Sequence, residues 1–359
     1  MAGLMTDVYT YEALVNKYAG FSVPAVRLYV DGRELDQDMT RNILKVEISL
    51  SVSAAGMAVI RIGNIYKREE RAFDQKIRGR LKLGAVVEVG IGYGSEITKV
   101  LKGFVALLGA EFTETPCLVV TVMDVRRLMM LGGVHQVLHH VKNYSDAVKT
   151  ILDGYSRLCK AEIDPTNDNL EAPLSQNATD YDFIAGELAG SGRAGREFFV
   201  LGDTAYFRKP AKEMRPVMQM EFGRELQMFR MEAGYLDLEV QVSGYDAREQ
   251  KIIRAGAAAK SGEPQASLSS RTPVSCILDP EADTQDKAGT RAEALARGQT
   301  AGVQRAQGTC IGLPGIVPGR YVEIVKLEAM ADRKYYVTSV RHEISEEFFM
   351  TEFETEGWA

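Results

Sequence analysis

The sequence has little cysteine, a single tryptophan and no long apolar run, and two of these shortages exclude whole classes of protein. The four cysteines, Cys117, Cys159, Cys276 and Cys310, lie far apart and show no CxxC spacing. A disulfide framework is therefore not expected, and neither is a zinc site built from closely spaced ligands. We expect four buried or partly buried thiols in a reducing compartment. No segment approaches the ~20 apolar residues that cross a bilayer, so stable membrane insertion is not expected.

Basic charge and a secretory signal are also missing. The first residues, MAGLMTDVYTYEAL, contain no basic region followed by an apolar core, so we expect synthesis in the bacterial cytoplasm as a soluble protein. If the protein is later found outside the cell, we expect it to arrive there by lysis or by assembly into a particle. The formal net charge of −6 argues against specific or general nucleic-acid binding, which requires cations facing the phosphates. An acidic surface suits a channel that an anionic polymer passes without sticking.

The sequence does contain β pattern near its N-terminus. The length of 359 residues predicts two or three domains. Ile43–Val52 alternates apolar and polar side chains, as a half-buried strand does. Further strand-like segments follow at a spacing of roughly 10 residues up to Val122, which predicts a β-barrel or sandwich. A short helix is expected before them, at Thr10–Ala19.

The C-terminal stretch, Gly308–Gly357, is expected to organise the rest of the chain. It opens with a run of turn residues and continues as a β-meander. A meander needs additional strands to bury its faces, and we expect Leu236–Glu249 to supply one. That segment is similar in pattern to Leu118–Arg127, because each is a strand that is followed by an Asp-containing turn. This similarity, which we call the echo, predicts two related β-domains. The expected meander strands are Tyr321–Leu327, Tyr335–Ile344 and Phe348–Glu354.

Between the β regions the pattern becomes mixed. A helix capped by Ser145 is expected through about Tyr155, and a second one, capped by Thr179 or Asp180, through about Gly190. A hairpin follows across Gly202-Asp203. Ala255–Gln285 loses β pattern and is expected to be an extended or mobile insertion, and Asp286–Ala306 is expected to be an Ala-rich helix. The predicted divisions are residues 1–127, 128–215, 216–254 with 306–359, and 255–305.

Short motifs give weak support for chemistry. Gly90, Gly92 and Gly94 resemble a dinucleotide fingerprint, but the following segment is β-like, so we expect a hairpin. No GxSxG occurs, and no carboxylate pair is selected by its spacing. Five methionines between Met214 and Met231 suit either a strand core or an adaptable contact surface. We therefore expect no enzyme activity and no cofactor.

The histidines are the remaining candidates for a metal site. If their segment is helical, His135 and His139 share one face beside His140, an arrangement that supports a metal ion. No acidic third ligand lies nearby in sequence, so a place at the surface or at an interface is favoured, and metal binding stays open. His342 lies inside an expected strand, where packing in the core or at its rim is the default.

Three stretches resemble a known family. The first is RLYVDGREL with ILKVEISLSVSAAG. The second is NYSDAVKTILDGY with NATDYDFIAGELAGSGRAGREFFVLGDTAYF, where Tyr181 stands at a position at which Trp is common. The third is VQVSGYDARE, the Ala-rich helix, and then GLPGIVPGRYVEIV, YYVTSVRHEI and FMTEFETEG. Together they resemble the phage late control protein D family. This family comprises the baseplate hub proteins of contractile tails and is similar to the hub-like N-terminal region of type VI secretion spike proteins.

The resemblance implies a fold and a function. Members are trimers in which each chain holds two similar β-barrels of the tube type, so three chains form a ring of six units. Such a ring adapts a sixfold tail tube to a threefold spike. The implied fold is mainly β, with two related barrels, a small α+β middle domain and an Ala-rich helix in an insertion. The implied partners are the tail tube, tape measure and baseplate proteins and a separate spike protein, since this sequence stops at Ala359. The implied destination is a virion tail or an extracellular tail-like particle.

Two other functions stay open: a tail-associated hydrolase of cell-wall glycan, and a glycan-binding module without catalysis. The first would use the histidine cluster or the middle domain. The second would need exposed aromatic side chains, yet the only tryptophan is Trp358 at the terminus. The sequence leaves open whether the particle is a phage, a bacteriocin or another injection system. Residues expected to mark the fold, and candidates for contacts, are Asp124, Gly244, Tyr245, Asp246, Gly315, Pro318, Gly319 and His342.

Overall fold

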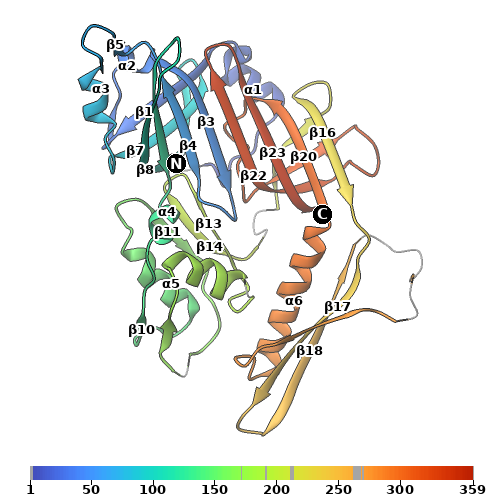
Figure 1. Ribbon diagram of the computed structural model, residues 1–359. Coiled ribbons are helices and arrows are strands. Elements are labelled where there is room, and N and C mark those ends of the chain that lie inside the picture. Colours follow the sequence, from blue (N-terminus) through green and yellow to red (C-terminus); the bar gives the residue numbers. More distant parts are fainter. Residues whose placement is uncertain are drawn as a thin grey trace.

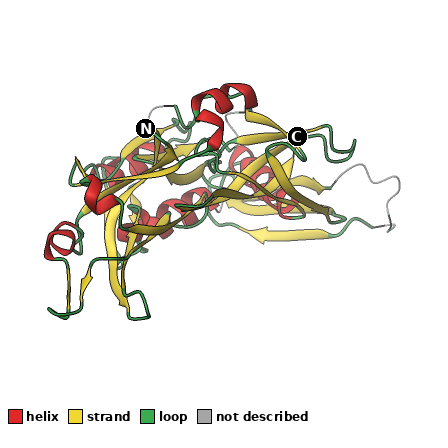
Figure 2. Ribbon diagram, turned by 90° about the horizontal axis from the view of Figure 1, so that it is seen from above, coloured by secondary structure: helices red, strands yellow, loops and turns green. Residues whose placement is uncertain are grey.

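Strands dominate the protein. The computed structural model describes residues 3–358 apart from 171, 191, 211–213, 262–267, 269 and 270. Seen from above, strands fill most of the molecule, and the helices are separate segments among and around them (Figure 2). The prediction of a mainly β fold with an α+β middle is confirmed.

The first β unit contains six principal strands. Their spatial order is β1-β7-β8-β9-β4-β3, and every neighbouring pair is antiparallel. Apolar side chains alternate along them and point into one core, as period-2 strands require. The strands are β1 (Pro24–Val30), β3 (Ile43–Ser51), β4 (Met57–Ile62), β7 (Val86–Tyr93), β8 (Glu96–Glu111) and β9 (Cys117–Met123).

The second β unit repeats this order. Its strands, taken along the chain, are β15 (Pro216–Glu221), β16 (Leu226–Ala233), β20 (Gln304–Ile311), β21 (Tyr321–Val325), β22 (Lys334–Ser345) and β23 (Phe349–Trp358). Their spatial order is β15-β21-β22-β23-β20-β16, which is the sequence of positions 1-4-5-6-3-2 found in the first unit. One pairing differs, because β15 runs parallel to β21 while β1 runs antiparallel to β7. A parallel bridge between Phe222 and Leu226 brings β15 to β16.

The two units share one sheet. β3 of the first unit pairs antiparallel with β22 of the second, from Ser51 opposite Ser339 to Lys45 opposite Ser345. The side chains of Val46, Ile48 and Leu50 on β3 are at most 1% exposed. A strand pair with one completely buried face fixes the register of the junction, since a one-residue slip would turn these side chains toward solvent.

Short elements precede or connect the strands of the first unit. The N-terminal helix α1 (Tyr11–Lys17) is capped by Thr10, whose Oγ1 accepts a hydrogen bond from the Ala13 N–H at 3.2 Å. Before it, the carbonyls of Leu4 and Asp7 accept hydrogen bonds from the buried Arg320 of the second unit. The remaining elements are η1 (Ala19–Phe21), β2 (Arg33–Glu34), α2 (Gln37–Thr40), β5 (Tyr66–Lys67), β6 (Ala72–Phe73) and α3 (Gln75–Arg80).

The middle segment is α+β. The helix predicted there is capped by Asn143 rather than Ser145, because the Asn143 side chain accepts from the Asp146 N–H at 2.8 Å. Thr179 accepts from the Asp182 N–H at the start of the second helix, and the hairpin across Gly202-Asp203 is confirmed. The elements are α4 (Arg126–Met129), β10 (Gln136–Leu138), α5 (Tyr144–Asp153), β11 (Lys160–Ile163), β12 (Leu174–Gln176), the π-helical η2 (Asp182–Gly190), β13 (Glu197–Leu201) and β14 (Thr204–Arg208).

A third region, residues 234–303, forms what we call the arm. It consists of β17 (Asp237–Asp246), β18 (Lys251–Lys260) and β19 (Val274–Leu278), in the order β18-β17-β19, with α6 (Gln285–Gly302) packed on one face. The prediction that Leu236–Glu249 pairs with the C-terminal meander is therefore wrong. The echo with Leu118–Arg127 is not a trace of duplication either, because the counterpart of β9 in the second unit is β23.

The expected insertion at Ala255–Gln285 also differs from the structure. Its described part contains the end of β18 and all of β19, and 262–267, 269 and 270 lie outside the described residues. Alanine occupies both faces of β18, so no apolar–polar alternation marked it as a strand. The small side chains let α6 lie close against the sheet: the buried Ala259 packs in the same cluster as Ala296. The predicted Ala-rich helix is confirmed as α6.

The arm and the middle segment lie at the same end of the shared sheet. The arm connects β16 to β20, where the first unit has the short turn of residues 52–56, and the middle segment connects β9 to β15. Figure 1 shows both below the sheet, with the turns β8–β9 and β22–β23 at the opposite end. One end of the sheet therefore repeats the turn between positions 5 and 6, with the β5–β6 hairpin added in the first unit, and the other end carries the arm and the middle segment.

Candidate functional site

The solvent face of the shared sheet carries a network of charges across the junction of the two units. Lys45 Nζ lies 2.6 Å from Glu343 Oε1 and 2.8 Å from Glu47 Oε1, and Arg341 reaches Glu47 and Glu343 at 3.2 Å each. The hydrogen bond that Lys45 donates to Glu343 raises the pKa of Lys45, and the one that Lys45 donates to Glu47 lowers the pKa of Glu47. Because these pairs are partly exposed, each contributes little alone, but together they connect β3 to β22.

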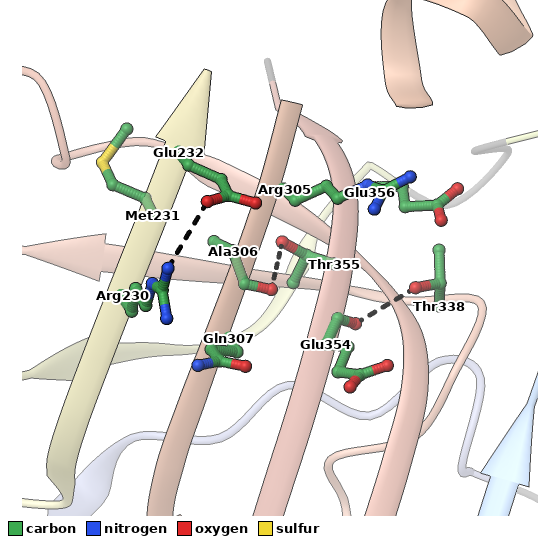
Figure 3. A pocket seen from close by; sticks show the side chains of 10 residues that line it. All are labelled: Arg230, Met231, Glu232, Arg305, Ala306, Gln307, Thr338, Glu354, Thr355 and Glu356. Atoms are coloured by element: carbon green, nitrogen blue, oxygen red, sulfur yellow. Dashed lines mark hydrogen bonds and ion pairs between the residues drawn. The ribbon is translucent and has the colours of Figure 1, made fainter. Parts of the chain in front are cut away.

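The same face continues over β23, β20 and β16 as a shallow polar groove of about 370 Å³. Figure 3 shows carboxylates and guanidinium groups side by side on neighbouring strands. The Arg230 guanidinium lies 3.6 Å from Glu232, and Thr338 donates a hydrogen bond to the Glu354 carbonyl at 3.3 Å. The groove is a charged surface of mixed sign. The charged side chains that line it are Arg230, Glu232, Arg305, Glu354 and Glu356.

The shared sheet has two free stretches of strand edge in the two units. Among the described residues, β16 beyond Leu226 pairs only with β20, and the last part of β8, residues 106–111, pairs only with β9. Leu107 on β8 is 62% exposed and Met228 on β16 is 41% exposed. A free strand edge presents unpaired backbone N–H and C=O groups, with which a strand of another chain can pair.

A buried ion pair holds the first unit to the middle segment. Asp124 follows β9 and Arg126 begins α4; both side chains are at most 1% exposed, with Oδ2 and Nη2 2.7 Å apart. Asp124 also accepts from the Gly56 N–H at 2.6 Å. Arg126 donates to the carbonyls of Ser51 and Val200, at 2.8 Å and 3.3 Å. The hydrogen bonds of this ion pair therefore connect the ends of β3 and β9 to the hairpin of the middle segment.

A second buried cluster holds the middle segment to the second unit. Arg208 on β14 lies with its Nε 2.8 Å from Glu197 Oε1, and Tyr336 on β22 donates to Glu197 Oε2 at 2.6 Å. Burial raises the pKa of Glu197, and burial beside that carboxylate raises the pKa of Tyr336. Arg208 also donates to the carbonyl of Gly319. Each β unit thus has its own charged contact with the middle segment.

Gly315, Pro318 and Gly319, which we predicted to mark the fold, lie in the loop before β21. The loop is largely buried and joins the common core through Ile316 and Val317. A Cβ on Gly315 would stand 2.9 Å from the Tyr9 ring, and Gly319 has φ of +83°, a conformation that suits glycine. These residues serve packing rather than an exposed contact.

His342 is fully buried in the core of the second unit. Its Nδ1 lies 2.9 Å from Thr351 Oγ1 on the neighbouring strand, and its ring meets Phe349 edge-on. Burial lowers the pKa of His342 to about 3 because the charged form has lost its water. The imidazole is therefore neutral at physiological pH.

The remaining predicted residues lie apart from these contacts. Gly244, Tyr245 and Asp246 end β17 at the arm, where Tyr245 is half exposed and Asp246 accepts from the Arg248 and Glu249 N–H groups. Asp124, which occupies the matching place in the similar segment Leu118–Arg127, lies between β9 and α4 and not in the arm.

The histidine cluster is spread over a strand and a loop rather than one helix. His135 precedes β10, with its Nδ1 3.4 Å from Asn177 Oδ1, and His139 and His140 follow that strand. Within the described part of the chain, no three or more His, Cys, Asp or Glu side chains are grouped to hold a metal ion. None of the described helices is long and apolar enough to cross a membrane. All four cysteines are free, and Cys276 is exposed, so the expectation of four buried thiols is wrong there.

Sequence reasoning missed the residues that hold the parts together. Glu197, Arg208 and Arg320 are charged, and charged side chains are expected at the surface. Arg208 sits in a strand of otherwise apolar and aromatic residues, TAYFR, and this was the only available signal. The sequence contains no signal for the free edges, because the exposure of Leu107 and Met228 depends on which strands pair.

The six-strand order, its repetition and the shared sheet define a tail-protein fold. A tail protein from Neisseria meningitidis shares it at a TM-score of 0.70 and 14% identity, with 93% of this chain and 96% of that chain covered. The 43 kDa tail protein of prophage MuSo2 from Shewanella oneidensis gives 0.69 at 13% identity, covering 92% and 97%. An Escherichia coli component of the type VI secretion system gives 0.60 at 9%, covering 92% and 77%. At such identities the likeness establishes the fold.

The chain belongs to the family described as the Alg8 N-terminal domain, whose model matches residues 22–346. This is not the late control protein D family that the sequence motifs resemble, and its description names no activity. No curated protein matches the chain.

Proposed function

We propose that this protein is a structural hub of a contractile phage tail or tail-like injection particle, in which three copies adapt a sixfold tube to a threefold spike. The observation that carries the proposal is the strand order 1-4-5-6-3-2, present twice in one chain. Two similar units in each of three copies give six similar positions around a ring. The likeness to tail proteins supports the same class of particle.

The internal junction supports a specific proposal for how the ring closes. Inside the chain, position 2 of the first unit, β3, pairs with position 5 of the second unit, β22. The same two positions have free edges elsewhere in the sheet, along β16 in the second unit and along residues 106–111 of β8 in the first. Pairing β16 of one copy with β8 of the next would repeat the internal junction between copies. Such a head-to-tail contact closes into a ring when its rotation matches.

Burial supports this pairing. On β3 the core side chains are at most 1% exposed because β22 covers their edge. On the free edges the corresponding core side chains, Phe229 and Met231 on β16 and Leu108 on β8, are only partly buried. A junction between copies would complete their burial, at about 25 cal/mol for each Å² of apolar surface covered.

The two ends of the sheet suit different symmetries. One end carries the equivalent turns β8–β9 and β22–β23, which would appear six times in a trimer. The other end carries one arm and one middle segment per chain, which would each appear three times. We infer that the first end meets the tube and the second meets the spike, with tape measure and other baseplate proteins as further neighbours.

The charged sheet face would line the channel of this ring. Its carboxylates, which include Glu47, Glu343, Glu354 and Glu356, face solvent together with a smaller set of cations. A lumen of this kind would let an anionic polymer pass without binding. No residue of this face is assigned a catalytic role, and the hub is not an enzyme in this proposal.

Measurement of mass in solution, with location of the chain in purified particles, tests the hub assignment. We expect a trimer placed between the tube and the spike. A protein that stays monomeric at all concentrations and never associates with either partner would overturn the proposal. The glycan hydrolase alternative predicts loss of wall-clearing in His139→Ala, whereas the hub predicts no effect of this exposed change on assembly. The glycan-binding alternative predicts that the purified protein binds peptidoglycan, which the hub does not require.

A further inference from the structure

Two turns at the same end of the shared sheet are structural equivalents. Residues 112–116 connect β8 to β9, and residues 346–348 connect β22 to β23, so each turn joins position 5 to position 6 of its unit. The strand registers place both turns at one end of the sheet, the end opposite the arm. Each turn presents a phenylalanine to solvent: Phe112 is 68% exposed and Phe348 is 38% exposed.

Aromatic neighbours hold the Phe112 ring, and hydrogen bonds hold the backbone of the Phe348 turn. The Phe112 ring lies 5.6 Å from the Tyr66 ring and 5.8 Å from the Phe73 ring, in a cluster of three aromatic side chains. The Phe348 turn is closed by Ser345, whose N–H donates to the Phe348 carbonyl at 2.9 Å and whose Oγ accepts from the Phe348 N–H. An exposed aromatic side chain on an ordered turn loses little conformational entropy on binding, as is typical of an interface anchor.

Exposed carboxylates accompany each ring. Glu111 and Glu114 flank Phe112, and Glu346 and Glu347 precede Phe348. The nearby β5–β6 hairpin contributes cations, but Arg68 is already hydrogen-bonded to the Glu114 carbonyl and Lys67 is paired with Glu70. An apolar ring beside carboxylates is complemented by an apolar pocket with a Lys or Arg rim.

We propose that Phe112 and Phe348 are paired anchors that dock into equivalent pockets on successive subunits of a sixfold ring. Each pocket would be apolar with a basic rim. The inference rests on the proposed hub function and deepens it, because it names the side chains that make one chain present two equivalent contacts. A partner with only three positions, such as the spike or a second copy of the trimer, would have no use for a matched pair in each chain.

The test uses the full-length chain and tail tubes purified from the same particle. Phe112→Ser, Phe348→Ser and the double variant are compared with Leu83→Ser, which changes a side chain of similar exposure (63%) away from both turns. Tube binding is measured by co-sedimentation over a range of trimer concentrations. We expect each single variant to bind roughly tenfold more weakly, the double variant at least roughly a hundredfold more weakly, and the control unchanged.

Mass measurement separates the two proposals. We expect the double variant to remain a trimer and to keep its association with the spike, since both rings are exposed. Normal tube binding by the double variant would overturn the paired anchors, and so would a loss confined to one single variant. Cross-linking of either turn to the spike or to another copy of this chain would overturn them too. If the unchanged protein fails to form a trimer, the hub function itself falls.

Discussion

The two β units have the same strand order, yet they differ in what joins the strands at one end of the sheet. In the first unit β3 returns to β4 through the turn of residues 52–56, whereas in the second unit the whole arm occupies the same position between β16 and β20. The turns between positions 5 and 6 stay short in both. The turn between positions 5 and 6 is thus kept in both units, while the β5–β6 hairpin beside Phe112 belongs to the first unit alone, and the arm and the middle segment each occur once at the opposite end.

The buried ion pairs at the middle segment give the largest expected effect. Asp124→Ala would leave Arg126 buried without its partner, and Glu197→Ala would do the same to Arg208. Each change is expected to lower the free energy of unfolding by about 3–5 kcal/mol, measured by urea unfolding. Asp153→Ala removes an exposed pair with Lys149 and should cost at most about 0.5 kcal/mol. Losses no larger than in this control would show that the units do not depend on these contacts.

Acid should distinguish the cores of the two units, because only the second contains a buried histidine. The neutral form of His342 is favoured in the native state, where its pKa is about 3, whereas the unfolded chain takes up a proton below about pH 6.5. Stability is therefore lost as pH falls through this window, by about 1.4 kcal/mol per pH unit.

The comparison for this prediction is His342→Gln, which keeps a polar group beside Thr351 and cannot titrate. Relative to this variant, the unchanged protein should lose roughly 3 kcal/mol between pH 6.5 and pH 4, measured from urea midpoints at both values. Parallel loss in the two proteins would mean that His342 is not the group that responds to acid.

The free edges should matter for assembly and not for the fold of one chain. Leu107→Asp and Met228→Asp each place a charge on an exposed side chain at an edge that, in the proposed ring, meets the next copy. We expect the trimer to dissociate at concentrations at least tenfold higher than before, equivalent to about 1.4 kcal/mol, in sedimentation equilibrium. Leu131→Asp, which changes an exposed side chain (55%) of the middle segment, is the matched control. An equal loss of trimer in this control would show that assembly does not depend on the two free edges.

The smallest effect concerns thiol exposure, which contrasts the arm with the β units. Cys276 on β19 is exposed, while Cys117, Cys159 and Cys310 are buried. Burial also raises the pKa of each buried thiol, that of Cys159 to about 11, and only the thiolate reacts. A thiol reagent should label one cysteine in the native protein and four after unfolding. Rapid native labelling of Cys310 would contradict the burial of the second unit.

Sequence patterning predicted the fold where one face of a strand is clearly apolar. Val46, Ile48 and Leu50 alternate with polar residues, and the strand, its buried face and the β-rich first unit were all predictable. The meander at the C-terminus was recognisable for the same reason. Patterning failed at β18, where alanines on both faces hide the period, and at β17, whose partners are fixed by tertiary packing.

The candidate site was less accessible to sequence reasoning. Whether β3 pairs with β22, and which edges stay free, depends on contacts between residues nearly 300 positions apart, as in the Arg341–Glu47 pair. The charged contacts between units use Arg126 and Arg208, whose types alone favour the surface. The internal repeat was predicted, but from the wrong pair of segments.

The central claim is that one chain carries the same sheet twice and that three copies close by repeating the internal junction. Electron cryomicroscopy of the purified assembly, viewed along its axis, tests this directly. We expect three copies with six similar units around the ring and β16 of each copy paired with β8 of the next. Copies that meet through other surfaces, with both edges left unpaired, would contradict it.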